Sequence, residues 1–230
     1  MIWFGKMTNS IKLTFKYFLL VLLLSLPFFI LGAFTGGTKN FLINLPVSAL
    51  MFICPTLALL FFDKVSFKQS LINIFDFKKI KNLIWILVIV LSLPLLMFVT
   101  FLTMKFTGVI LPDIEFKLLE TVILFVLFFF AATFEELGWT GYLTRQLLKS
   151  NTIVVAGATI GILWAIWHII PYLQEDKSFV WIFWQCATAI LLRILMVWVF
   201  VRSGASLFLI ILFHTMINMV VNDKLNKTDT

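Results

Sequence analysis

The chain has 230 residues, of which 62% are hydrophobic and 13% are charged, and its mean hydropathy is +1.08. Soluble domains are about half apolar and about a quarter charged, so this composition excludes a water-soluble globular protein and predicts a membrane protein. The formal net charge of +7 does not indicate nucleic-acid binding, because the charged residues separate apolar runs instead of forming one cluster.

Seven apolar stretches approach the roughly 20 residues that a helix needs to cross a bilayer. The fourth and seventh are short at their cores and extend into weakly polar flanks. No linker, internal repeat or low-complexity tract divides the chain. We therefore predict one all-α transmembrane bundle over residues 1–230 with about seven spans; an eighth helix around residues 67–77, re-entrant or interfacial, is the alternative. The seven stretches are residues 13–34, 41–62, 83–104, 118–134, 152–170, 179–201 and 205–221.

The distribution of lysines and arginines predicts the orientation in the membrane. Lysines before the first stretch resemble those of a signal peptide, but the stretch is long enough to span, so we expect an uncleaved signal anchor. The loop after the second stretch carries five lysines, whereas the loop before that stretch carries one. Because basic residues concentrate in cytoplasmic loops, we expect a multi-pass cell-membrane protein with a cytoplasmic N-terminus and an external C-terminus.

Polar residues interrupt the apolar stretches in the C-terminal half. Ionisable groups at bilayer depth cost about 2.5–3.5 kcal/mol each, so they face the bundle interior or a water-filled cavity. Both histidines of the chain lie in such stretches, and His214, Asn218 and Asn222 are spaced four apart on one helix face. These residues are candidates for a functional site. The set comprises Glu135, Glu136, His168, Arg193, His214, Asn218 and Asn222.

A depth calculation brings three of these residues to one layer. Glu135 lies 15 residues before the turn at Ser150, and His168 lies 17 residues after Asn151. In continuous helices these offsets are roughly 23 and 26 Å. His214, ten residues beyond Gly204, can share the layer. The neighbouring Glu135 and Glu136 point about 100° apart, so they cannot have the same role.

Three segments in this order resemble the CPBP family of intramembrane proteases. The family motifs are EExxxR, (F/W)xxxH and Hxx(x)(N/B) on successive core helices. This chain reads Glu135-Glu136-Leu-Gly-Trp-Thr140, then Trp164-Ala-Ile-Trp-His168, then His214-Thr-Met-Ile-Asn218. The family includes CAAX prenyl endopeptidases and bacteriocin-processing or immunity proteins. The resemblance predicts a protease-like core at about residues 118–221.

One position departs from the family pattern. Thr140 stands where the family has arginine, and Arg145 lies nearly opposite Glu136 on the helix. Arg193, on the sixth span, could reach into the bundle and balance Glu136.

The resemblance implies hydrolysis of a peptide bond inside the membrane. We expect Glu135 to be the general base for a water molecule, His214 and Asn218 to stabilise the oxyanion, and His168 to orient the water or pass a proton. Glu136, Arg193 and Trp164 would support these residues. The substrate would be a membrane-embedded peptide or a lipoprotein. A metal-free reaction is the first expectation, and Zn²⁺ is the open alternative.

Three alternatives remain open. Glu135, His168 and His214 could bind Zn²⁺. An inactive family member could bind a peptide or a membrane partner as an immunity or scaffold protein, which the threonine at position 140 favours. A transporter could use the same residues as a proton relay, although the chain shows no inverted repeat.

Overall fold

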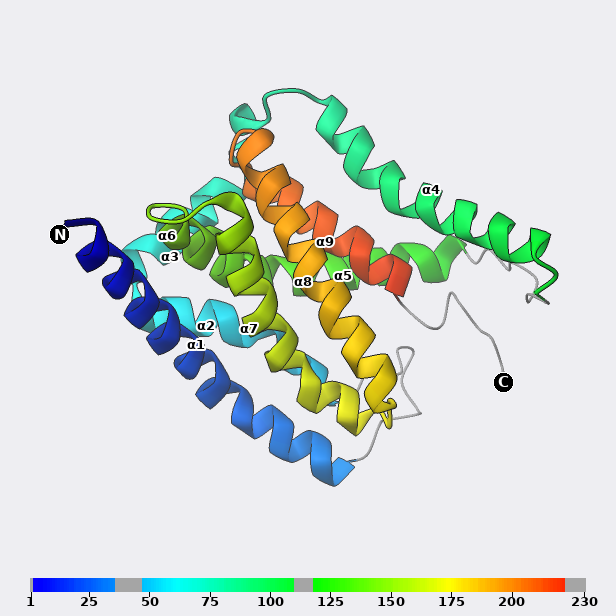
Figure 1. Cartoon of the computed structure of the whole chain (residues 1–230), viewed down its shortest axis with the longest axis horizontal. Coiled ribbons are helices and arrows are strands. Elements are labelled where there is room, and N and C mark those ends of the chain that lie inside the picture. The colour runs from blue at the N-terminus through cyan, green and yellow to red at the C-terminus, as the bar shows by residue number, and fades with distance from the viewer. Residues whose placement is uncertain (1, 36–46, 110–117, 222–230) are drawn as a thin grey trace.

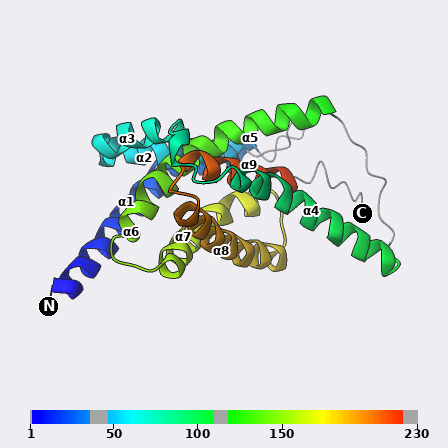
Figure 2. The ribbon, with the colours of Figure 1, turned by 90° about the horizontal axis from the view of Figure 1, so that it is seen from above.

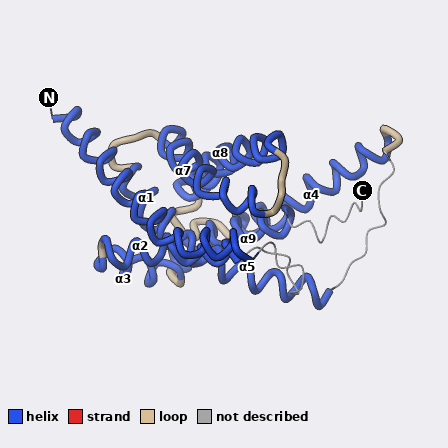
Figure 3. Tube along the Cα trace, turned by 90° about the horizontal axis from the view of Figure 1, so that it is seen from below, coloured by secondary structure: helices blue, strands red, loops and turns tan. Residues whose placement is uncertain are grey.

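A computed structural model describes residues 2–35, 47–109 and 118–221, and every regular element in these ranges is a helix (Figure 3). The predicted all-α membrane bundle is thereby confirmed. The elements are α1 (Ile2–Thr35), the 3₁₀ helix η1 (Val47–Ile53), α2 (Cys54–Phe62), α3 (Lys64–Ile74), the 3₁₀ turn η2 (Phe77–Lys79), α4 (Ile84–Phe106), α5 (Leu118–Gly138), the π-helical segment η3 (Trp139–Thr144), α6 (Arg145–Leu147), α7 (Ile153–Gln174), α8 (Phe179–Arg202) and α9 (Leu207–Val221).

The helices form two layers (Figures 1 and 2). One layer is the antiparallel pair α7 and α8. The other contains α5 and α9, with α2 and α3 beside them. Helix α1 slants across the edges of both layers, and α4 extends outward beside α9. Ile89 is the only buried residue of α4, so the apolar side chains of this helix are available to lipid.

Five of the seven predicted spans are long and apolar enough to cross a membrane, and two are shorter apolar helices. The shorter ones are Val47–Phe62 and Leu207–Val221; residues 41–46 of the predicted second span lie outside the described residues. The fourth predicted span, short at its apolar core, extends through its weakly polar flank as predicted. It continues through η3 and α6 as Leu118–Leu147, because its polar residues are buried against other helices and do not mark a helix end.

The helix expected around residues 67–77 is present as α3, which starts a few residues earlier. Asp63 caps its N-terminus by accepting hydrogen bonds from the backbone N–H of Ser66 at 3.0 Å and from the Ser66 hydroxyl at 2.7 Å. These hydrogen bonds lower the pKa of Asp63 below its usual value. Helix α3 packs against η3 and α9, at the end of the bundle where α8 and α6 terminate.

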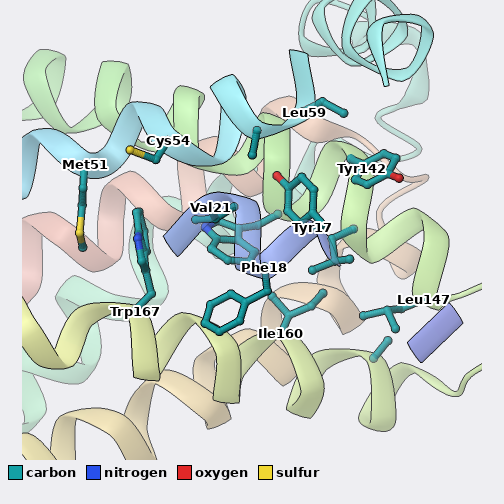
Figure 4. Close-up of a cluster of buried hydrophobic side chains, with 14 of the residues drawn as sticks. Tyr17, Phe18, Val21, Met51, Cys54, Leu59, Tyr142, Leu147, Ile160 and Trp167 are labelled. Atoms are coloured by element: carbon teal, nitrogen blue, oxygen red, sulfur yellow. The ribbon is translucent and has the colours of Figure 1, made fainter. Parts of the chain in front are cut away.

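A buried cluster from α1, α2, η3 and α7 fixes the region around the two glutamates (Figure 4). The Tyr17 hydroxyl donates to the carbonyl of Pro55 at 2.7 Å. A Cβ atom at Gly138 would lie 2.3 Å from that hydroxyl and 2.6 Å from that carbonyl, so only glycine permits this approach. The hydroxyl of Thr56 donates to the carbonyl of Phe134. Helices α1 and α2 therefore hold α5 on both sides of Glu135 and Glu136.

Two glycines allow α7 and α8 to approach closely. A Cβ atom at Gly157 would lie 2.6 Å from Cα of Ile194, and one at Gly161 would lie 2.7 Å from Cα of Ile190. The spacing of four residues places both glycines on one face of α7, as in close helix pairs of membrane proteins. This contact brings Arg193 of α8 toward α5.

We expect Gly161→Leu to destabilise the bundle by about 1–3 kcal/mol, because the new side chain must push α8 away. Thermal unfolding of the purified protein measures the effect. Val155→Leu, at an exposed apolar position of the same helix, is the control and should unfold like the wild type. Equal unfolding temperatures for Gly161→Leu and the wild type would contradict this packing.

Candidate active site

The two adjacent glutamates of α5 are both buried, but they have different surroundings. They occupy the last turn of α5, directly before the π-helical segment η3. Such π-helical turns occur often at functional sites. Because adjacent helix positions point about 100° apart, the two carboxylates reach different partners.

Glu136 has both carboxylate oxygens engaged. Its Oε1 accepts from Nη1 of Arg193 at 2.6 Å and lies 2.8 Å from Nδ1 of His214. Its Oε2 accepts from the hydroxyl of Thr140, one turn later, at 2.5 Å. The carboxylate and the guanidinium are fully enclosed, so each compensates the buried charge of the other. The predicted contact between Arg193 and Glu136 is confirmed.

Glu135 is only partly engaged. Its Oε2 accepts from the indole N–H of Trp164 at 2.8 Å, and its Oε1 accepts no hydrogen bond from any residue that the structure describes. Trp164 belongs to α7, so this one hydrogen bond joins α7 to α5 and fixes the position of the Glu135 carboxylate. One oxygen of Glu135 therefore remains available for another donor, such as a water molecule.

Both histidines use Nδ1 for a structural hydrogen bond. Nδ1 of His168 lies 2.8 Å from the carbonyl of Trp164, and Nδ1 of His214 lies 2.8 Å from the carboxylate of Glu136. A carbonyl and a carboxylate can only accept, so each Nδ1 carries the proton. In the neutral rings Nε2 then has a free lone pair, which can accept a proton or orient a water.

Trp164 connects the candidate residues. Its ring centre lies 4.2 Å from that of His168 and 5.7 Å from that of His214. The guanidinium carbon of Arg193 lies 4.6 Å from the Trp164 ring centre, in a cation–π contact. The indole therefore touches residues of α5, α7, α8 and α9. Glu135, His168 and His214 lie around this one indole, an arrangement that the depth calculation allowed.

Asn218 completes the set on α9. It lies one turn after His214 on the same helix face, is partly exposed and makes no hydrogen bond with the described part of the chain. Its side-chain amide is thus free to contact a ligand. Asn222, the third member of the predicted stripe, lies outside the described residues.

The zinc alternative takes Glu135, His168 and His214 as its three ligands. In residues 2–35, 47–109 and 118–221 no three His, Cys, Asp or Glu side chains are placed to hold one metal ion. A catalytic zinc requires three protein ligands at about 2.0–2.2 Å from the metal. Glu135, His168 and His214 are neighbours around an indole, and the Trp164 ring lies among them.

The fold and the site together define a multi-pass helical membrane protein with a buried carboxylate, histidine and arginine cluster. Residues 117–220 match the family model for type II CAAX prenyl endopeptidase Rce1-like proteins. The chain is 27% identical to CAAX prenyl protease 2 of Methanococcus maripaludis in an alignment of 233 positions. The alignment covers 93% of this chain and 86% of that protein. These two similarities support the resemblance to the CPBP family of intramembrane proteases that the three motifs indicated.

Proposed function

We propose that this chain is an intramembrane endopeptidase that cleaves a membrane-associated peptide or protein with water activated by Glu135. The observation that carries the proposal is the different engagement of the two glutamates. Glu136 has both oxygens bonded to fixed partners, whereas Glu135 is fixed through one oxygen and keeps the other. A general base needs this combination of a fixed position and a free oxygen within reach of water.

In the proposed reaction, Oε1 of Glu135 takes a proton from a water molecule as the water oxygen attacks the peptide carbonyl carbon. A carbon–oxygen bond forms, and the negative charge moves to the carbonyl oxygen. Glu135 then returns the proton to the peptide nitrogen, the carbon–nitrogen bond breaks, and the products are a carboxylic acid and an amine. Proton transfer by a positioned side chain contributes typically about 10²–10⁴-fold to such a rate.

His168, His214 and Asn218 are proposed to assist Glu135. The Asn218 amide is the donor we assign to the oxyanion, together with His214 when Nε2 carries a proton. His168, with Nδ1 held by the Trp164 carbonyl, has Nε2 available to orient the water or pass the proton. Glu136, Arg193 and Thr140 act indirectly, because they hold His214 and the end of α5 in place.

We expect metal chelators to leave cleavage unchanged, because the proposed water activation uses a carboxylate and the described residues form no metal-ligand cluster. The measurement is cleavage by the purified protein in lipid after treatment with 1,10-phenanthroline. A zinc endopeptidase with the same substrate serves as the control. Loss of activity that added Zn²⁺ restores would replace this mechanism with the zinc alternative.

The inactive-member alternative rested on the threonine at position 140. Arg193 supplies a cation to Glu136 from α8, so the departure at Thr140 does not leave this carboxylate unpaired. This contact favours an active enzyme over a scaffold or immunity protein.

The substrate we propose is a membrane-embedded peptide or a lipoprotein. We also propose that the N-terminus of the bundle lies in the cytoplasm. The test compares the peptides of cells that contain the wild type, the Glu135→Gln variant or no protein. A fragment that forms only with the wild type identifies the substrate. Identical peptide sets in all three cells, under conditions where the protein is inserted, would argue for a binding role.

A further inference from the structure

A second polar feature lies away from the glutamates, at the end of the bundle where α8 and α6 terminate and α4 begins. It is a cavity of about 720 Å³ between α3, η3, α6 and the turn that joins α8 to α9. We call it the basic cavity. Three of its lining residues are cations, and none is acidic: Lys81, Arg145 and Lys149.

The turn between α8 and α9 forms one wall of the basic cavity. Gly204 has φ of +103°, and a Cβ atom there would lie 2.0 Å from the carbonyl of Lys79. The backbone N–H of Lys81 donates to the carbonyl of Ser203 at 3.2 Å. The fold therefore brings Lys81, from the lysine-rich segment before α4, to the wall of the cavity that Arg145 and Lys149 also line.

Arg145 has unused hydrogen-bonding capacity. Its guanidinium stacks on the ring of Phe200 at 5.0 Å and donates to the carbonyl of Ala205 at 3.3 Å. A guanidinium carries five N–H donors. Its Nε is buried and has no partner among the residues that the structure describes. Among the described residues, Lys149 donates to Gln146 at 2.7 Å, a contact exposed to solvent.

Neither Asp63 nor Asp76 forms an ion pair with one of the three cavity cations in the described structure, although the charge of Lys149 acts on Asp63 and helps to lower its pKa. The carboxylate of Asp63 caps α3 through Ser66, and Asp76 pairs with Lys79 at 3.3 Å. Ser70 and Asn73, both buried, add hydroxyl and amide groups to the cavity wall. Clustered cations with polar donors match the oxygens of a phosphate group.

The surroundings of the cavity favour a lipid as the source of that phosphate. Its volume exceeds that of a free phosphate ion, and Tyr142, Leu148 and Phe200 give it an apolar wall. On α3, Val65 is 81% exposed beside Lys64 and Lys68, and Phe75, directly after the helix, is 73% exposed. Exposed apolar side chains beside lysines are typical of helices at membrane interfaces. Basic pockets between membrane helices on the cytoplasmic side bind acidic lipid headgroups.

We propose that the basic cavity binds a phosphate group, carried by an anionic phospholipid. Arg145 and Lys81 contact the phosphate oxygens, and Lys149 closes the rim. The bound lipid bridges α3, α6 and the α8–α9 turn.

The test is the thermal unfolding of the full chain in detergent, titrated with phosphatidylglycerol, phosphatidylcholine or inorganic phosphate. We expect a saturable rise in unfolding temperature with phosphatidylglycerol alone. Arg145→Gln and Lys81→Gln should each weaken the titration midpoint by about tenfold, the effect of one charged hydrogen bond. The control variant Lys105→Gln removes one exposed positive charge outside the cavity and should titrate like the wild type.

Lys81→Gln removes no side-chain hydrogen bond of the described structure, so it tests the site even if Arg145→Gln disturbs folding. The unfolding temperature of each variant without lipid reports any general loss of stability. Equal stabilisation by inorganic phosphate would overturn the lipid assignment. The phosphate site would be overturned if neither phosphatidylglycerol nor inorganic phosphate stabilised the protein. It would also be overturned if Lys105→Gln weakened the phosphatidylglycerol titration as much as the two cavity variants. Native mass spectrometry of the purified protein should show one bound phosphatidylglycerol, lost in the Arg145→Gln variant.

Discussion

Replacement of Glu135 by glutamine should abolish peptide cleavage and leave the folded protein intact. The glutamine keeps the size of the side chain and an oxygen that accepts from the Trp164 indole, but it cannot take a proton from water. Loss of a general base lowers a rate by about 10²–10⁴-fold, so cleavage should fall at least by the lower figure. The measurement is single-turnover cleavage by the purified variant in lipid, with thermal unfolding as the test of folding.

Two further glutamine substitutions on the same helix separate the roles of its carboxylates. Glu120→Gln, at the other end of α5, should change neither activity nor stability. Glu136→Gln should destabilise the protein by about 3–5 kcal/mol, because it leaves the enclosed guanidinium of Arg193 without its counter-charge. Cleavage by Glu135→Gln near the wild-type rate would remove Glu135 from the mechanism.

The helices could be predicted because lipid requires apolar length, and this property is visible in single segments. Hydropathy identifies the apolar core of the fourth span, residues 118–134, but not the contacts that hold its polar flank. The polar segment after Phe134 remains helical because Tyr17, Pro55 and Ser70 pack against its glycines Gly138 and Gly141. These contacts join residues far apart in the sequence, and no local pattern reveals them.

The site residues could be predicted because ionisable groups inside apolar spans are rare and the motif spacing is specific. Their individual partners required the fold. The spacing of Glu136 and Thr140 indicated a shared face. The position of the Trp164 indole beside Glu135, His168 and His214 follows instead from the way α7 packs against α8, α1 and η3. Similarly, a spacing of four between glycines predicts a close helix contact but does not identify the neighbouring helix.

The second large effect concerns Arg193. Arg193→Leu should destabilise the protein by about 3–5 kcal/mol, because Glu136 keeps its charge in an enclosed position with only His214 and Thr140 as partners. Activity should fall as well, since the carboxylate of Glu136 holds His214. Thermal unfolding and cleavage are measured together. The control is Arg202→Leu, at the exposed end of the same helix, which should be silent in both measurements.

The decisive comparison adds Thr140→Arg to both backgrounds. In the wild type, the Thr140 hydroxyl reaches Oε2 of Glu136 at 2.5 Å from one turn away. In the Arg193→Leu variant, an arginine at position 140 therefore returns a cation to Glu136, and part of the lost stability and activity should return. In the wild type, the same substitution places a second guanidinium in an enclosed site that Arg193 already neutralises, so it should destabilise the protein. One substitution then has opposite effects in the two backgrounds, which measures the coupling between positions 140 and 193. Silence of Arg193→Leu in both measurements would show that Arg193 does not replace the arginine of the family motif.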